Sequence, residues 1–419
     1  MNILLIYELL PREILSLKVL ARVLERRGHT VTIVGYPEAN ATIRKIQPDI
    51  VVNNTNRQKE HFYPYFYGLR HHDFKIVDLP WEQIIVPTIR WAFKYKDGFQ
   101  QKYIDLRLAW GEGFKRHSVN EGLKAENVIV TGSPKQSLIP LMQAVIDKEA
   151  VKSVILGENH PHSKIVLVTC GFPGAFLEVN RHQGNPAAYN YLKFNIPWSK
   201  IYNALYIQLI KEIAPRYPEV LFLVRLHPGK FVELREMFGQ NTKDSPNVFL
   251  NWEGDFNWLL LVADLVIATR STALIDAYLA EIPALNLLDP EVDPYLTDPY
   301  SLMPFDLFGE LVSKQDIINH LPQYLSGTYR YDLPRLAQIW LHDWINTQGW
   351  KCFDNIAAAL EEVHQRPRRD WGRQFLYEHK WKIKRWREAR FAHQRPPVDF
   401  HSYGFPGLDD LLLANLPDG

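Results

Sequence analysis

Short apolar runs alternate with segments of helical periodicity along this chain, and no other feature constrains its fold as strongly. Residues 2–7 are typical of a buried strand, and residues 14–27 carry apolar side chains at helical spacing. Further strand-like runs stand at 29–36 and 49–54. Parallel strands need long crossover connections, which are usually right-handed and helical. We therefore expect a parallel sheet with helices on its faces, and a loop over residues 8–13.

The alternation breaks near the middle of the chain and then restarts, which divides the chain into two halves. At 419 residues the chain exceeds what one core usually supports. The predicted fold class is therefore α/β, with two Rossmann-like doubly wound domains and a helical C-terminal extension. The predicted boundaries are 1–136 for the first domain, 137–163 for a linker, 164–330 for the second domain and 331–419 for the extension. Further strands are predicted at 74–80, 107–111, 127–132, 164–171, 220–228, 247–252, 264–269 and 283–288, and helices of the second half at 199–214, 255–263, 272–281 and 314–325.

The charge balance and the cysteine count argue against several classes of protein. The formal net charge is +1, so no global field directs the chain to nucleic acid. Two cysteines, Cys170 and Cys352, cannot form a disulfide framework, which favours a reducing compartment. No signal-peptide pattern and no apolar run of eighteen residues is present. We predict a cytoplasmic protein, with peripheral contact to the inner membrane left open.

The run LFLVRLHPGK places cationic and imidazole groups at the end of a predicted buried strand. Arg225 belongs to the end of the apolar run, and His227 and Lys230 follow it. In open α/β sheets, ligands bind at the carboxyl ends of the strands. We predict that Arg225, His227 and Lys230 bind the phosphate of a small molecule. The alternative for His227 is a histidine that caps a helix or packs in a core.

A second motif, about forty residues further on, places hydroxyl groups at a predicted helix start. Arg270, Ser271 and Thr272 lie between the predicted strand 264–269 and the helix after it. The free amides and the dipole of a helix N-terminus favour an anion. We predict a phosphate site here as well, with Asp276 one turn deeper. The alternatives are a plain N-cap for the hydroxyls, a surface ion pair for Arg270 and a solvated position for Asp276.

Two glycines follow the first predicted strand of the second half. Gly171 and Gly174 would let the backbone approach a phosphate or a sugar closely, whereas the alternative is a plain loop. The segment is not a dinucleotide fingerprint, and no Walker motif is present.

These motifs together resemble the glycosyltransferase-B fold, in which two Rossmann-like domains face a central cleft. More narrowly, RLHP and STALIDAYLAEIPALNL look like bacterial surface-carbohydrate transferases, and WGEGFKRHSV and VIVTGSPKQ are similar to the same group. The resemblance covers roughly residues 1–330. It implies that His227, Ser271 and Thr272 hold the phosphate of a nucleotide-sugar donor and that Asp276 contacts the ribose or the sugar.

The sequence favours chemistry without a metal or a cofactor. No Asp-x-Asp motif stands near a predicted strand end, and neither the pair His71-His72 nor the pair His160 and His162 has a carboxylate or cysteine partner at ligand spacing. Preorganised hydrogen-bond donors can stabilise a leaving phosphate in place of a cation. We therefore expect the nucleotide-sugar to be a substrate of a metal-independent enzyme.

An inverting transferase also needs a base, which should come from the first half. Glu112 lies between two glycines in WGEGF, and Glu8 follows the first strand. We predict Glu112 as the base, with Glu8 as the second candidate. A retaining mechanism would need no such base.

The region from 366 to 395 mixes basic and aromatic residues. This composition fits either a helix packed on the body of the protein or an interfacial helix on a membrane. The function predicted from the sequence is a nucleotide-sugar-dependent glycosyltransferase that acts on a surface-polysaccharide or lipid-linked glycan acceptor. The alternatives are a nucleotide-sugar epimerase of the same fold and a non-catalytic protein of glycan assembly.

Overall fold

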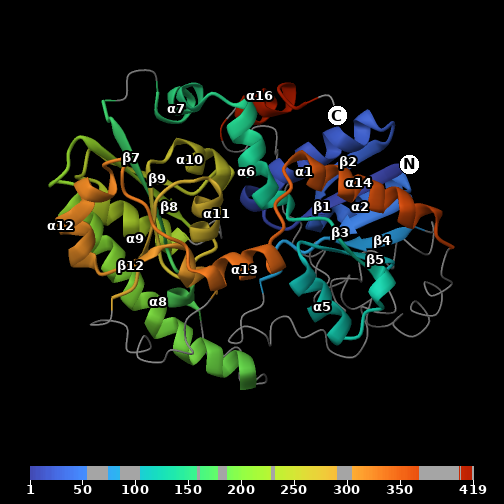
Figure 1. The fold of residues 1–419 in the computed structure, drawn as a ribbon, viewed down its shortest axis with the longest axis horizontal. Helices are drawn as coiled ribbons and strands as arrows, with labels where there is room; N and C mark the ends of the chain where they lie inside the picture. Colours follow the sequence, from blue (N-terminus) through green and yellow to red (C-terminus); the bar gives the residue numbers. More distant parts are fainter. Residues whose placement is uncertain are drawn as a thin grey trace. The chain divides into compact units, whose positions relative to one another are not determined.

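The chain forms two compact α/β units (Figure 1). The structure is a computed structural model that describes residues 1–53, 74–84, 104–157, 161–177, 186–227, 232–289, 304–367, 405 and 407–417. The described residues of the first unit lie within 1–84, 104–138 and 341–409, and those of the second lie within 139–340 and 410–417. The chain leaves the first unit inside helix α6 (Pro134–Val145) and returns to it inside helix α13 (Arg335–Trp344). Residues 341–367, expected in a separate extension, therefore group with the first unit.

The first unit is built on a six-stranded sheet in the order β2-β1-β3-β4-β5-β6. Every pair of neighbouring strands is parallel, as the alternation in the sequence predicts. The strands β1, β3, β4 and β5 are buried because helices cover the sheet, whereas the edge strands β2 and β6 are only partly buried. The strands are β1 (Asn2–Tyr7), β2 (Thr30–Gly35), β3 (Ile50–Asn53), β4 (Lys75–Asp78), β5 (Leu106–Ala109) and β6 (Val128–Val130), and the helices are α1 (Leu10–Arg26), α2 (Ala39–Ile46), α5 (Glu112–Asn120) and α14 (Trp350–Gln365).

The second unit repeats this architecture with a sheet in the order β12-β11-β10-β7-β8-β9. Numbered within the unit, this is the 3-2-1-4-5-6 order of a doubly wound dinucleotide-binding fold, read from the β9 edge. All five strand pairings are parallel. The strands are β7 (Lys164–Cys170), β8 (Val220–Leu226), β9 (Val248–Asn251), β10 (Leu265–Ala268), β11 (Ala284–Leu287) and β12 (Glu310–Val312), and the helices are α7 (Lys148–Leu156), α8 (Pro186–Ile213), α9 (Val232–Thr242), α10 (Phe256–Val262), α11 (Ala273–Leu279) and α12 (Lys314–Tyr324).

The expected loop over residues 8–13 is wrong, because α1 begins at Leu10. Pro11 suggested a loop, but it stands in the first turn of the helix. Proline is tolerated there because the amide it lacks would have no intrahelical partner anyway. The early start places Arg12 and Glu13 in the first turn of α1, directly after β1.

The glycines of the WGEGF segment admit another part of the first unit. A Cβ atom on Gly111 would lie 2.3 Å from the carbonyl oxygen of Asp343, and one on Gly113 would lie 2.7 Å from the ring of Trp344. The C-terminal end of α13 therefore packs directly on the start of α5. These two glycines therefore allow close packing within the first unit.

The C-terminal extension is helical where the structure describes it. It contains α13, α14 and the short α16 (Leu408–Ala414). Helix α14 packs against α1, as Figure 1 shows. Most of the basic and aromatic region 366–395 lies outside the described residues. Within the described part of the chain, no helix is both long and apolar enough to span a bilayer.

The packing of Gly111 predicts a specific loss of stability. Gly111→Ala should lower the free energy of unfolding by about 1–3 kcal/mol, because the new methyl group meets backbone atoms that cannot rotate away. Gly239→Ala is the control, since a Cβ in α9 there has no neighbour closer than 4.0 Å. That change should be neutral or stabilising. Urea unfolding of both variants checks the prediction, and equal midpoints would contradict it.

Candidate functional site

The order of strands in the second sheet reverses between β7 and β10, and such a reversal is where doubly wound sheets bind ligands. Val168 of β7 is paired with Ile267 of β10. Continuing this register by three residues brings Gly171 level with Arg270. On the other side of β7, Cys170 is paired with Leu226, so Gly171 is also level with His227. The carboxyl edge of the sheet thus collects Gly171, His227 and Arg270, as the sequence motifs predict.

Gly171 and His227 approach each other closely at this edge. Gly171 has a φ of 84°, in the left-handed region that favours glycine. A Cβ atom there would lie 3.4 Å from the backbone nitrogen of His227. That backbone N–H donates to the carbonyl of Cys170, whereas the His227 residue is exposed. The sheet therefore fixes the backbone of His227, although the residue as a whole is exposed.

Arg270 adopts a backbone conformation that is unfavourable for its residue type. Its φ is 46°, and arginine has no side-chain feature that favours the left-handed region. The backbone N–H of Arg270 donates to Oδ1 of Asn286, at 3.3 Å. The Nδ2 of Asn286 donates to the backbone and side-chain oxygens of Asp306. Asn286 and Asp306 are both buried, so a fixed polar network holds the strained residue.

A second buried hydrogen-bond chain fixes the residue before Arg270. The Thr269 hydroxyl donates to the carbonyl of Leu287 at 2.7 Å. Having used its only proton, it accepts from the hydroxyl of Tyr206, 2.9 Å away. Burial raises the pKa of Tyr206, which keeps this hydroxyl protonated. The end of β10 is therefore held from both β11 and α8.

The Ser-Thr motif lies at the predicted helix start, with one difference. Helix α11 has only seven residues, shorter than the predicted 272–281. The Ser271 hydroxyl accepts the backbone N–H of Ala273, whereas Thr272 makes no side-chain capping bond. Both residues are partly exposed. Asp276 is fully buried, so the alternative of a solvated position is wrong.

Two other predicted residues, Arg225 and Gly174, make their contacts elsewhere in the second unit. The guanidinium of Arg225 is buried and donates to Asn251 and to the carbonyls of Glu253 and Gly254, which anchors the loop after β9. Gly174 packs against α8, where a Cβ would lie 1.9 Å from Oδ1 of Asn195. Lys230 lies outside the described residues. A donor-binding role for these three residues stays a prediction.

The predicted bases belong to the first unit, at separate places. Glu112 is exposed at the start of α5. Glu8 follows β1, where its side chain is 46% exposed and 3.9 Å from Arg12. The first sheet also reverses its strand order next to β1, between β1 and β3. Glu8 therefore stands at a switch point of its own unit, whereas Glu112 follows β5.

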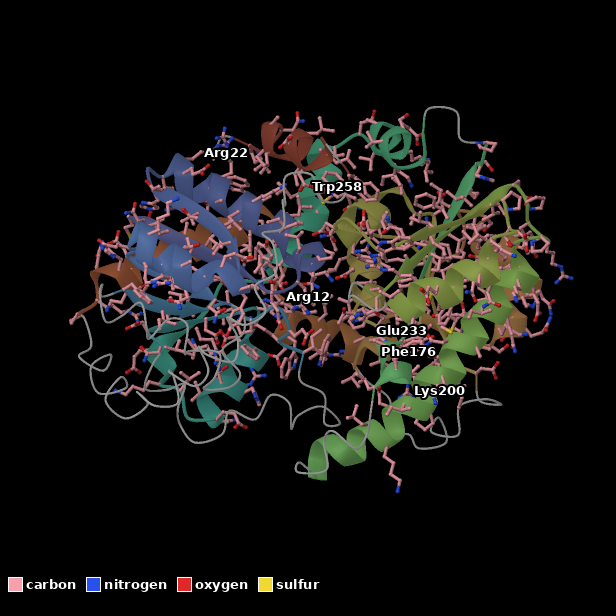
Figure 2. All side chains as sticks on the ribbon, turned by 180° about the vertical axis from the view of Figure 1, so that it is seen from behind. Arg12, Arg22, Phe176, Lys200, Glu233 and Trp258 are labelled. Atoms are coloured by element: carbon pink, nitrogen blue, oxygen red, sulfur yellow. The ribbon has the colours of Figure 1, made fainter. Side chains whose placement is uncertain are left out.

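A buried carboxylate beside Glu8 was not among the predicted site residues. Glu13 accepts the backbone N–H of Glu8 and two guanidinium bonds from Arg12, and its side chain is fully buried. Burial raises the pKa of Glu13 to about 7, although Arg12 opposes the shift. Arg12 also pairs with Glu82, which follows β4. Figure 2 marks Arg12 on the first unit. The sequence does contain a signal for this residue, because Pro-Arg-Glu is typical of the first turn of a helix. The proline was instead interpreted as part of a loop, so Glu13 was not placed in a helix.

Among the described residues, no three histidine, cysteine, aspartate or glutamate side chains gather closely enough to hold a metal ion. The absence of a metal or a cofactor from the reaction stays a prediction.

The comparisons with known proteins support the fold. Protein-family models give no match, and curated proteins give none either. Three solved structures with the same fold are UDP-N-acetylglucosamine 2-epimerases. The Methanocaldococcus jannaschii enzyme, in complex with UDP-GlcNAc and UDP, has a TM-score of 0.55 at 14% identity, with 86% of this chain and 100% of that chain covered.

The other two structures agree with the first. The Rickettsia bellii enzyme has a TM-score of 0.52 at 12% identity, over 87% of this chain and 97% of that one. The Neisseria meningitidis enzyme bound to UDP-GlcNAc has a TM-score of 0.50 at 14% identity, over 87% and 99%. The predicted two-domain glycosyltransferase-B fold is confirmed. The assignment as a glycosyltransferase is wrong, because these structural neighbours are epimerases.

The pKa of Glu13 predicts a pH dependence of stability. A glutamate with an ordinary value of 4.5 that is raised to about 7 keeps its proton in the folded state while the unfolded chain loses it. The free energy of unfolding should therefore fall as pH rises from 4.5 to about 7, by up to about 3 kcal/mol for this difference in pKa.

Urea unfolding at several pH values measures this dependence. Glu13→Gln should flatten the dependence, because glutamine does not titrate. The control is Glu126→Gln, at a side chain that is 68% exposed, which should leave it unchanged. If Glu13→Gln and the parent chain lost the same stability between pH 5 and pH 7, the pKa of Glu13 would not be raised in the folded protein.

Proposed function

We propose that the chain is a nucleotide-sugar epimerase that acts on a UDP-N-acetylhexosamine. The observation that carries the proposal is the fold shared with UDP-N-acetylglucosamine 2-epimerases over 86–87% of the chain. Sequence identity to these enzymes is 12–14%, so the proposed substrate is inferred from the fold and the site and not from a close sequence relationship. Of the alternatives that the sequence left open, the epimerase agrees best with the structural neighbours.

The carboxyl edge of the second sheet supports binding of the nucleotide diphosphate. Gly171 allows a ligand to approach the backbone, and His227 and Arg270 follow the strands on either side of β7. The partly exposed hydroxyls of Ser271 and Thr272 follow directly. These groups are hydrogen-bond donors, and Arg270 carries a permanent positive charge, which is the chemistry that a diphosphate needs.

The strained backbone of Arg270 fits the same role. A non-glycine residue held in the left-handed region costs on the order of 1–3 kcal/mol, and such residues cluster at ligand sites. Here the cost is offset by the buried Asn286 and Asp306, which fix the backbone at the strand end. We infer that this backbone conformation directs the side chain of Arg270 toward the phosphate of the ligand.

Inversion of a carbon centre needs a group that removes a proton and a group that returns one on the other face. The first unit contains a cluster that suits this chemistry: Arg12 pairs with Glu8, Glu13 and Glu82. Glu8 and Glu82 have half-exposed side chains, so they can meet solvent or substrate, whereas Glu13 is buried. Glu8 is our first candidate for proton transfer, and Glu112 remains the second.

The proposal predicts turnover of the nucleotide-sugar alone. Purified protein incubated with UDP-N-acetylglucosamine should convert it to its 2-epimer without any acceptor, and the product should carry deuterium at the inverted carbon when the reaction runs in heavy water. Proton NMR of the sugar signals measures both. Turnover should also survive EDTA. No conversion with intact, folded protein would contradict the proposal, and rescue by Mg²⁺ after EDTA would contradict the metal-free part of it.

Substitution of Arg270 tests the phosphate site. Arg270→Asn should raise KM for the nucleotide-sugar by about tenfold to a hundredfold, because a charge-assisted hydrogen bond contributes about 1.5–3 kcal/mol. Asparagine tolerates the left-handed backbone, so the strand end keeps its shape. The control is Arg330→Asn, at an exposed position of the same unit. Equal KM values for the two variants would remove Arg270 from the site.

A further inference from the structure

Phe172 directly follows Gly171 and therefore stands beside the candidate phosphate site, at the carboxyl edge of the second sheet. The residue is partly exposed. Consecutive Cα atoms are about 3.8 Å apart, so a phosphate that lies against Gly171 has Phe172 as a near neighbour. An aromatic side chain is thus placed where the groups attached to a diphosphate would lie.

The backbone of Phe172 is fixed by one side chain of helix α8. Oδ1 of Asn203 accepts the backbone N–H of Phe172 at 2.8 Å, and Nδ2 of Asn203 donates to its carbonyl oxygen at 3.1 Å. Asn203 is 2% exposed, so water competes little for these two bonds. Since both polar backbone atoms of Phe172 contact a buried amide, the exposed part of the residue is mainly its side chain.

The ring of Phe172 is held by three other aromatic rings, all from α8. Its centroid lies 4.9 Å from that of Trp198, and 6.0 Å from those of Tyr202 and Tyr206. The three side chains follow one another at intervals of four residues, so they share one face of the helix. All three are buried, whereas Phe172 is partly exposed. This aromatic cluster therefore reaches the surface at Phe172.

The same face of α8 also supports the arginine of the phosphate site. The hydroxyl of Tyr206 lies 2.9 Å from that of Thr269, which immediately precedes Arg270. One helix thus fixes both the turn after β7 and the end of β10. Phe172 and Arg270 are positioned before any ligand arrives, and a ligand that contacts both loses less free energy in ordering the protein.

A fixed and partly exposed ring beside a diphosphate site suits a flat group that the diphosphate carries. A nucleotide-sugar carries two rings, the sugar and the base. The proposed reaction changes the configuration of one carbon of the sugar, whereas the base is the same in substrate and product. A side chain held by three neighbours adjusts poorly to two shapes of sugar, but it can stack on the base in both states. Aromatic side chains stack on any base, because every base has a flat π face.

We propose that Phe172 is the stacking platform for the base of the nucleotide. The inference rests on the proposed function, because it presupposes that the diphosphate binds at this edge. It adds a contact that requires a base but does not select which base is bound.

Calorimetric titration of the full chain with UDP and with inorganic pyrophosphate tests the proposal. The parent protein should bind UDP more tightly than pyrophosphate, which has no base. Phe172→Leu should weaken UDP binding by about fivefold to a hundredfold, the factor that corresponds to about 1–3 kcal/mol of stacking per base. Pyrophosphate binding should be unchanged. Leucine fills much of the same space against α8, so the variant should keep its fold.

Two further variants separate stacking from packing. Phe172→Tyr keeps the ring and should bind UDP as the parent does. Phe176→Leu is the matched control, because Phe176 ends the short 3₁₀ helix η6 (Pro173–Phe176) that follows Phe172 and is 39% exposed (Figure 2). That change should leave the affinities for both ligands unaltered.

Three results would overturn the inference alone. They are equal UDP affinity of Phe172→Leu and the parent, equal losses of UDP and pyrophosphate affinity in Phe172→Leu, and a parent protein that binds pyrophosphate as tightly as UDP. The second of these would indicate that the ring only supports the fold. A folded parent protein that bound neither ligand at millimolar concentration would contradict the proposed function, and this inference with it.

Discussion

The hydrogen bonds of Asn286 are the constraint on which the candidate site depends. One side chain of β11 accepts the backbone N–H of Arg270 and donates to Asp306, in a place that water does not reach. A buried amide whose donor and acceptor are both used fixes its neighbours, because any rearrangement would leave a polar group unsatisfied. The strained turn after β10 is therefore maintained by packing and not by a ligand. Ser271 and Thr272 follow this turn, so their positions depend on the same bonds.

Much of the fold follows from the sequence because apolar runs and helical spacing record burial directly. Each predicted strand matches an observed one to within two residues at each end, and the motifs after β7, β8 and β10 do lie on one edge. What the sequence conceals depends on distant contacts. The fit of Gly111 against Asp343 joins residues more than two hundred positions apart, and no local pattern indicates it. The buried pairs of Arg225 and Glu13 are hidden in the same way, since a charged residue at a strand end or in a first helical turn looks functional whether its partner is a ligand or the chain itself.

The central claim is that the carboxyl edge of the second unit holds the diphosphate of a nucleotide-sugar. A crystal structure of the full chain grown with UDP tests it most directly, because the positions of the phosphates and the base are then seen. The account predicts phosphate oxygens within hydrogen-bond distance of Arg270 and of the Ser271 or Thr272 hydroxyl, with Gly171 against the ligand. A diphosphate bound elsewhere on the protein, with this edge empty at saturating UDP, would contradict it.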